Sequence, residues 1–283
     1  MKDLFMHAHR SSDAHGAVYV PRSQHRVMYS QAENREYHIY IAIPAEEPPV
    51  SGYPIIYVLD ANSVFGTLVE AVRVQGRRPD KTGVVPAIIV GIGYPTEAPF
   101  HPSRYYDLTL PGTAVELPVR PNGEAPIESG GAEHFLSFIE DELKPEMERD
   151  FHIDRSRQTI FGHSLGGLFV LHTLFTRPGS FQVYVAGSPS IHWGGRAIME
   201  EEKHFLASTA QEQRNKRLLI AVGELEAGHS SGMQEKAREL AERLTNVNDS
   251  GLHVEFREFA DEGHISVLPV LVSRAVRFAS ICH

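Results

Sequence analysis

The chain has 283 residues, 42% hydrophobic and 22% charged, which is the composition of an ordinary globular protein and not of a disordered or fibrous one. Its formal net charge is −9 and it has no run of lysine and arginine, so we expect no nucleic-acid partner. Its single cysteine, Cys282, excludes an internal disulfide framework.

The first sixteen residues, MKDLFMHAHRSSDAHG, contain no apolar core of signal-peptide length, and no transmembrane stretch follows them. The expectation is therefore a cytoplasmic protein with no membrane partner. The length fits one large α/β domain as well as two small ones, and we expect a single domain over residues 1–283. The sequence does not indicate an oligomeric state.

Two kinds of strand are predicted in chain order. Residues 35–44, REYHIYIAIP, alternate apolar and polar side chains, as a strand with one wet face does. Later runs are continuously apolar, as expected of strands covered on both faces. These runs are residues 54–60, 87–93, 158–162, 183–188 and 218–224.

Helical patterns separate the apolar runs. Residues 133–151 place apolar side chains on one face, and Pro145 should kink this helix because it removes a backbone hydrogen bond. Residues 233–244 have a regular amphipathic spacing. Alternating strands and helices predict an α/β fold with a mostly parallel central sheet and helices on both faces.

The stretch from residue 94 to residue 131 breaks this rhythm. It holds seven prolines and little periodicity. Long loops inside compact domains are often functional. We expect this one to border a site, either as an ordered wall or as a mobile lid, and not to link two domains.

The sequence GHSLG, residues 162–166, matches the G-x-S-x-G elbow and is flanked by the predicted strand QTIF and by a helix-like run. Gly162 and Gly166 would allow close backbone packing, and the helix N-terminus would favour developing negative charge. A serine that only caps the helix is the alternative. The flanking elements favour Ser164 as a nucleophile.

A nucleophilic serine needs a general base, and in this elbow type the chain order is serine, acid, histidine. His172 lies within the following helix, and His253 lies in the strand-like stretch 252–259. His264 lies in a loop between that strand and the last apolar helix, where its ring can reach the elbow. We therefore predict His264 as the base.

The acid should follow the strand at 218–224, where Glu224 and Glu226 both qualify. Its role is to hold the imidazole tautomer and to stabilise the imidazolium. We favour Glu226 because it lies further past the end of the strand, and Glu224 remains the alternative.

An oxyanion hole needs two backbone donors. The amide of Leu165, directly after Ser164, is one candidate. The other should follow the early central strand YVLDAN, where we choose the amide of Asn62, with Ala61 as the second choice. Asp60 is expected to shape that turn.

Several blocks resemble the putative-esterase (esterase D-like) branch of the α/β hydrolases. They are YVLDAN, GIGYP, RYYDLTLP, the stretch from GGAEHF to PSIHW, VGELE and EGHISVLP, in the same order as in that branch. Within it, the chain is most similar to bacterial ferric-siderophore esterases related to the trilactone hydrolases of salmochelin and bacillibactin. The resemblance covers roughly residues 20–280 and implies an α/β-hydrolase fold without a separate cap domain.

The resemblance implies the roles already given to Ser164, His264, Glu226 and Asn62, although some siderophore hydrolases rely on a Ser–His pair with a weakly placed acid. It also implies substrate-binding residues. Arg104 matches the arginine of an RxxDlT block and would contact an acidic or catecholate group. Trp193 matches the second aromatic residue of an SPS-W-W block, whereas His192 replaces the first.

The predicted reaction is ester hydrolysis through an acyl-enzyme, acting on the ester or lactone bonds of a siderophore that is iron-loaded or iron-free. It needs no cofactor, and no histidine spacing indicates a metal site. Alternatives are an esterase or thioesterase for small acyl groups and, from another class, a non-catalytic binding module. An anionic ferric substrate would need a local basic patch, for which Arg104 with Arg73, Arg77 and Arg78 are the candidates, unless Arg77 and Arg78 form only a solvated helix end.

Overall fold

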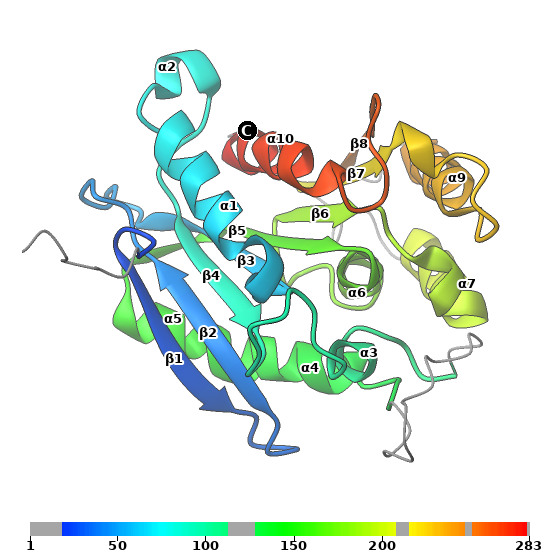
Figure 1. Ribbon diagram of the computed structural model, residues 1–283, viewed down its shortest axis with the longest axis horizontal. Helices are drawn as coiled ribbons and strands as arrows, with labels where there is room; N and C mark the ends of the chain where they lie inside the picture. Colours follow the sequence, from blue (N-terminus) through cyan, green and yellow to red (C-terminus); the bar gives the residue numbers. More distant parts are fainter. Residues whose placement is uncertain (1–18, 113–127, 208–214, 247–250, 282–283) are drawn as a thin grey trace, which may run out of the picture.

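The computed structural model describes residues 19–112, 128–207, 215–246 and 251–281 (Figure 1). Eight strands form one sheet in the order β1-β2-β4-β3-β5-β6-β7-β8. The strands are β1 Ser23–Tyr29, β2 Glu36–Ala42, β3 Tyr53–Leu59, β4 Ile88–Gly93, β5 Ile153–His163, β6 Val183–Gly187, β7 Lys216–Gly223 and β8 Leu252–Phe259.

The pairing of the strands confirms the predicted mostly parallel sheet. β1 pairs with β2, and β2 with β4, in antiparallel register, whereas all pairs from β4 to β8 are parallel. The central strands β3 and β4 are buried at every position, as their continuous apolar runs predict. β1 is not among the predicted strands, because most of its side chains are exposed and its sequence lacks an apolar run.

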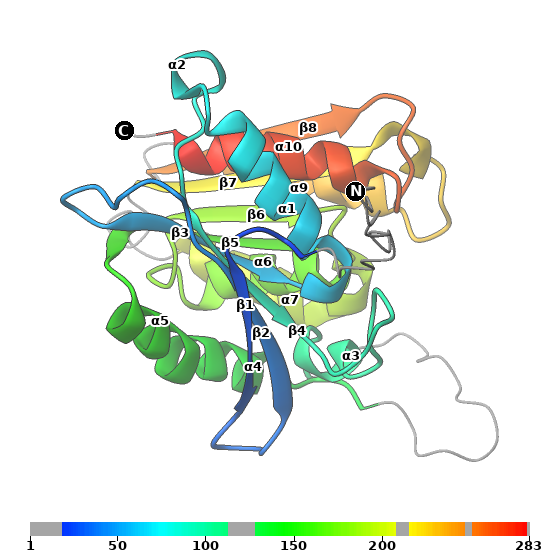
Figure 2. The same cartoon turned by 60° about the vertical axis from the view of Figure 1, so that its left-hand side comes forward.

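Helices cover both faces of the sheet (Figure 2). α1 and α10 pack together on one face, whereas α4, α5, α6, α7 and α9 lie on the other. The helices are α1 Ala61–Gln75, α2 Pro79–Thr82, α3 Arg104–Asp107, α4 Ala132–Phe138, α5 Lys144–Asp150, α6 Leu165–Thr176, α7 Ile191–Ala207, α9 Met233–Thr245 and α10 Val267–Ser280, with a 3-10 turn, η3, at Glu224–Glu226. Together these layers make the α/β-hydrolase architecture that the sequence predicts.

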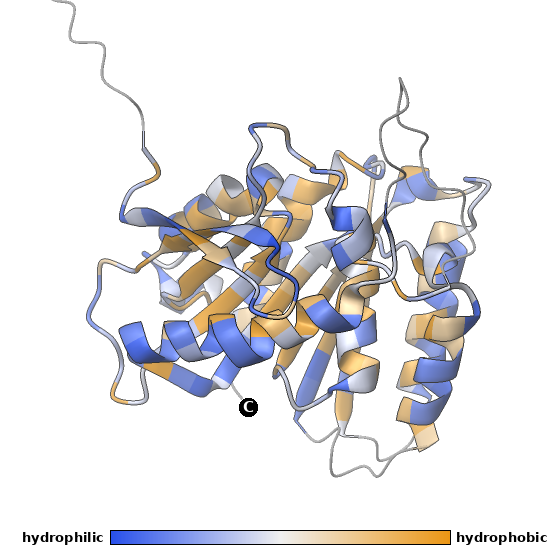
Figure 3. Cartoon of the chain, turned by 90° about the horizontal axis from the view of Figure 1, so that it is seen from below, coloured by the Kyte–Doolittle hydropathy of each residue, from blue (hydrophilic) through white to orange (hydrophobic). Residues whose placement is uncertain are grey.

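Two apolar cores follow from this layering, one on each face of the sheet. Hydrophobic residues colour the strands and the helix surfaces packed on them, while hydrophilic residues gather on the outer helix surfaces (Figure 3). None of the helices in the four described ranges has the length and apolar character that a membrane crossing needs.

The predicted helix over residues 133–151 is interrupted by a π-helical turn, η2, at Ile139–Leu143. α5 begins directly after it, with Pro145 in its first turn. A proline there needs no amide hydrogen bond, and the wider turn removes the clash between its ring and the preceding carbonyls. The kink predicted at Pro145 is therefore accommodated by η2, which the apolar periodicity does not reveal.

The proline-rich stretch 94–131 is only partly described, because residues 113–127 lie outside the described residues. The described part contains the short helix α3, which the sequence pattern does not predict. Five residues of the described part, Phe100, His101, Pro102, Arg104 and Tyr105, line the same pocket as Ser164 (see below).

Candidate active site

Ser164 occupies the sharp turn between β5 and α6. Its φ of 59° and ψ of −116° are unusual for a residue with a side chain, and this strained geometry raises the hydroxyl above the end of the sheet. Gly162 is required here, because a Cβ atom on it would overlap the backbone of Gly166. Gly166 itself has ordinary space for a Cβ, whereas one on Gly167 would come 2.7 Å from the carbonyl oxygen of Gly187. The second close approach is thus at Gly167 and not, as predicted, at Gly166.

Three of the predicted residues form one hydrogen-bonded chain. His264 Nε2 lies 3.1 Å from Ser164 Oγ, and His264 Nδ1 lies 3.1 Å from Glu226 Oε2. Because a carboxylate can only accept, Nδ1 carries the proton and the Nε2 lone pair faces the serine hydroxyl. This is the geometry that a serine nucleophile and its base require.

Glu226 is held tightly in the 3-10 turn η3 and is 4% exposed. Burial raises the pKa of its carboxyl. Hydrogen bonds from His264, from Ser188 Oγ at 2.6 Å and from the Gly223 amide at 2.7 Å together lower that pKa by more than burial raises it, so the net shift is downward. Glu224 points elsewhere and accepts from the Asp261 amide. The geometry therefore separates the two carboxylates that the sequence leaves open.

Leu165 and Asn62 are both placed in the first turn of a helix. Leu165 is the first residue of α6 and Asn62 the second of α1, so their amides have no intrahelical acceptor. Asn62 lies in a helix and not in the loop expected after the strand. Its side chain bonds the Tyr94 amide at 2.9 Å and the Thr96 carbonyl at 2.8 Å, which ties α1 to the loop that follows β4.

A pocket of about 360 Å³ opens beside Ser164 and His264. Residues 100–102 with Arg104 and Tyr105 form one wall, to which Phe100 and Tyr105 contribute aromatic rings, and Ile265 forms another. Arg104 lies in this pocket, but Asp60 holds it through two hydrogen bonds of 2.9 and 2.8 Å. Asp60 has a left-handed backbone conformation with φ 51°, so it shapes the turn, as expected, and also pairs with Arg104.

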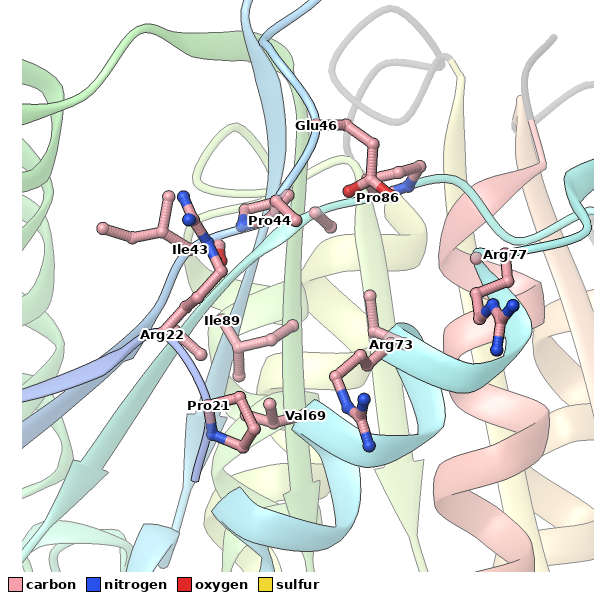
Figure 4. A pocket seen from close by; sticks show the side chains of 15 residues that line it. Pro21, Arg22, Ile43, Pro44, Glu46, Val69, Arg73, Arg77, Pro86 and Ile89 are labelled. Atoms are coloured by element: carbon pink, nitrogen blue, oxygen red, sulfur yellow. The ribbon is translucent and has the colours of Figure 1, made fainter. Parts of the chain in front are cut away.

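The predicted basic patch is wrong, because the structure separates its members. Arg73 and Arg77 line a different, mainly apolar pocket of about 340 Å³ beside the C-terminal half of α1 (Figure 4). Arg73 pairs with Glu70 and Arg78 with Asp80. Only Arg104 borders the pocket beside Ser164.

His192 and Trp193 lie in the first turn of α7. The centroid of the Trp193 ring lies 5.6 Å from that of Tyr105, which lines the pocket beside Ser164. His192 lines a separate groove between α7 and α9. Neither side chain is among those that line the pocket beside Ser164.

Sequence reasoning misses two neighbours of the triad-like chain. Ser190 Oγ lies 3.2 Å from Ser164 Oγ, and its amide donates to the Ser164 carbonyl. His163 Nε2 lies 2.7 Å from the backbone oxygen of His264 and must therefore donate to it. Burial lowers the pKa of His163 to about 4 and keeps it neutral. The sequence could have pointed to His163, because it is the variable residue directly before the serine in the G-x-S-x-G motif.

A family model described as "Putative esterase" matches residues 30–264. The chain belongs to this family of esterases. It is 57% identical over 263 residues to the ferri-bacillibactin esterase BesA of Bacillus subtilis (strain 168), covering 93% of this chain and 91% of the relative. It is 33% identical to the apo-salmochelin esterase of Escherichia coli O6:H1, covering 81% and 70%.

Solved structures agree with this assignment. The crystal structure of BES protein from Bacillus cereus superposes with a TM-score of 0.87 at 43% identity, covering 94% of this chain and 99% of that one. The siderophore hydrolase EstA of Aspergillus nidulans superposes with a TM-score of 0.77 at 29% identity, covering 92% and 94%.

Proposed function

We propose that the protein is a serine esterase that hydrolyses the ester or lactone bonds of a siderophore through an acyl-enzyme. The observation that carries the serine mechanism is the chain from Glu226 through His264 to Ser164, which opens onto a pocket. The siderophore substrate rests on the 57% identical relative, whose name states that substrate class.

In the first half of this reaction, Ser164 Oγ attacks the acyl carbon and passes its proton to His264 Nε2. The carboxylate of Glu226, already accepting from Nδ1, stabilises the imidazolium that forms. His264 then gives the proton to the departing alkoxide, which leaves as an alcohol. In the second half, water takes the place of that alcohol and releases the free acid.

The negative charge on the acyl oxygen needs donors that are already in place. The amides of Leu165 and Asn62 supply two at helix N-termini, where the helix dipole also favours negative charge. His163 donates to the His264 carbonyl and so supports the loop that holds the base. Ser190 Oγ, in turn, restricts the rotamer of the nucleophile.

The test compares the wild-type protein with Ser164→Ala on three substrates: a ferric triscatecholate trilactone, the same compound without iron, and 4-nitrophenyl butyrate. Mass spectrometry follows the trilactones and absorbance the simple ester. We expect the wild type to cleave a trilactone with the highest kcat/KM and the variant to cleave nothing above background. A clear preference for 4-nitrophenyl butyrate would contradict the siderophore substrate, and retained cleavage in Ser164→Ala would contradict the serine mechanism.

A further inference from the structure

A second hollow lies beside the candidate active site. It is a groove of about 690 Å³ between α7 and α9, which pack against each other (Figure 1). Ile191, Met199 and Leu206 give it apolar walls, and Lys203 and Lys236 give it cationic ones. The reaction described above uses none of these side chains.

One end of this groove is lined by the two residues that follow Ser190, a neighbour of the nucleophile, in the chain. Ser190 Oγ lies 3.2 Å from Ser164 Oγ, and the next two residues, Ile191 and His192, already line the groove. His192 Nδ1 is buried and has no hydrogen-bond partner among the described residues. A polar atom of a ligand at this end could supply the partner that Nδ1 lacks.

The side chains that line the groove carry more positive than negative charge, whereas the whole chain has a net charge of −9. Glu202 is committed to Arg243 through hydrogen bonds of 2.6 and 2.9 Å. Lys203 and Lys236 form no ion pair with any described carboxylate, which leaves Glu239 as the opposing charge on the lining. A chain of net charge −9 thus presents in this groove two lysines without an ion pair to a described carboxylate.

Lys236 lies close enough to His192 to act on its titration. Burial lowers the pKa of His192, and the ammonium of Lys236 and the nearby imidazoles of His229 and His264 lower it further. The base of the proposed reaction and the cationic groove therefore lie within one electrostatic neighbourhood. An anion bound there would relieve the mutual repulsion of these groups.

We propose that the α7–α9 groove is a second substrate subsite, which holds an anionic aryl arm of the substrate while another arm's ester lies on Ser164. Lys236 and Lys203 contact the anionic oxygens, the apolar walls contact the ring, and His192 closes the end that it lines. This proposal rests on the proposed function, because a trilactone carries three arms and only one ester can reach Ser164 at a time.

The test measures KM for Lys203→Ala, Lys236→Ala and the double variant. Lys81→Ala, an exposed lysine on α2 outside the groove, is the matched control. Lys236→Arg tests rescue, because Lys236 also donates to the Ser231 carbonyl at 2.5 Å and its loss could loosen that loop. The substrates are the ferric trilactone, a chromogenic aryl ester bearing a carboxylate, and neutral 4-nitrophenyl butyrate.

We expect the double variant to raise KM for both anionic substrates about tenfold, as loss of a charge-assisted contact does, with kcat changed less than about twofold. KM for the neutral ester should stay at the wild-type value, and Lys236→Arg should restore most of the loss. Unchanged KM for the anionic substrates, or an equal rise for the neutral ester, would overturn the subsite.

The two proposals fail in different ways. If the wild type leaves every trilactone intact while the lysine variants still raise KM for the anionic aryl ester, the siderophore function is refuted and the groove remains only a site for anionic aryl groups. If the wild type cleaves the trilactone and the double variant keeps its KM, the function stands and the groove is refuted.

Discussion

Glu226 and Glu224 share one turn after β7, yet only one carboxylate reaches the imidazole. Replacing Glu226 with Gln keeps the shape but removes the charge that stabilises the imidazolium. We expect kcat for 4-nitrophenyl butyrate to fall at least about 100-fold. Glu224→Gln removes a charge that does not reach His264, and its amide oxygen can still accept from the Asp261 amide, so this variant should stay within about twofold of the wild type. Equal losses in both variants would contradict the role proposed for Glu226.

Asp107 takes no part in the proposed reaction, but its buried carboxyl makes the stability of the fold depend on pH. Burial raises the pKa of its carboxyl from 3.8 to about 7, although hydrogen bonds from Tyr94 and Tyr37 and the charge on Arg35 partly oppose the shift. The folded protein therefore binds more protons than the unfolded chain between these values, so its stability falls as pH rises from about 4 to about 7.

Asp107→Asn should remove that dependence, because the amide is neutral at every pH. We expect the variant to gain stability relative to the wild type as pH rises from 4 to 7, measured by urea unfolding at fixed ionic strength. Asp80→Asn, an exposed carboxylate on α2, is the control and should follow the wild type. A stability difference that is constant across this range would show that Asp107 ionises normally.

At the scale of elements, the apolar runs predict the central parallel strands well. Both faces of β3, β4 and β7 are buried, and a strand buried on both faces has a continuous run of apolar residues. The strand order cannot be predicted in the same way, since it depends on which elements pack in three dimensions. The Asp60–Arg104 pair shows the same limit. It joins the residue that follows β3 to the first residue of α3, 44 positions away, and no local pattern encodes it.

The packing of α6 against β5 gives a prediction at this scale. A Cβ on Gly162 would overlap the Gly166 backbone, which cannot move without displacing the start of α6. We expect Gly162→Ala to lower the free energy of unfolding by about 2 kcal/mol or more and Tm by roughly 5 °C. Gly179→Ala is the control, because nothing lies within 4 Å of its Cβ position. Equal Tm values for Gly162→Ala and the wild type would contradict this packing argument.

At the scale of the whole molecule, the described residues form two apolar cores, and both are built on the same strands. Phe169 on α6 belongs to the core on one face and Phe278 on α10 to the core on the other. Alternate side chains of each central strand point into opposite cores, so neither core can be lost while the strands keep their partners. This arrangement supports a single folding unit for the described residues.

Unfolding should then be one cooperative transition, whichever core is weakened. Phe169→Ala and Phe278→Ala should each cost about 3–5 kcal/mol and shift the entire transition. Trp193, the one tryptophan of the chain, packs against the first core and reports on that face by fluorescence, whereas far-UV circular dichroism reports on all elements. We expect the two signals to coincide in both variants. If Phe278→Ala moved the dichroism transition but left the Trp193 transition in place, the two faces would unfold separately and the chain would not be one unit.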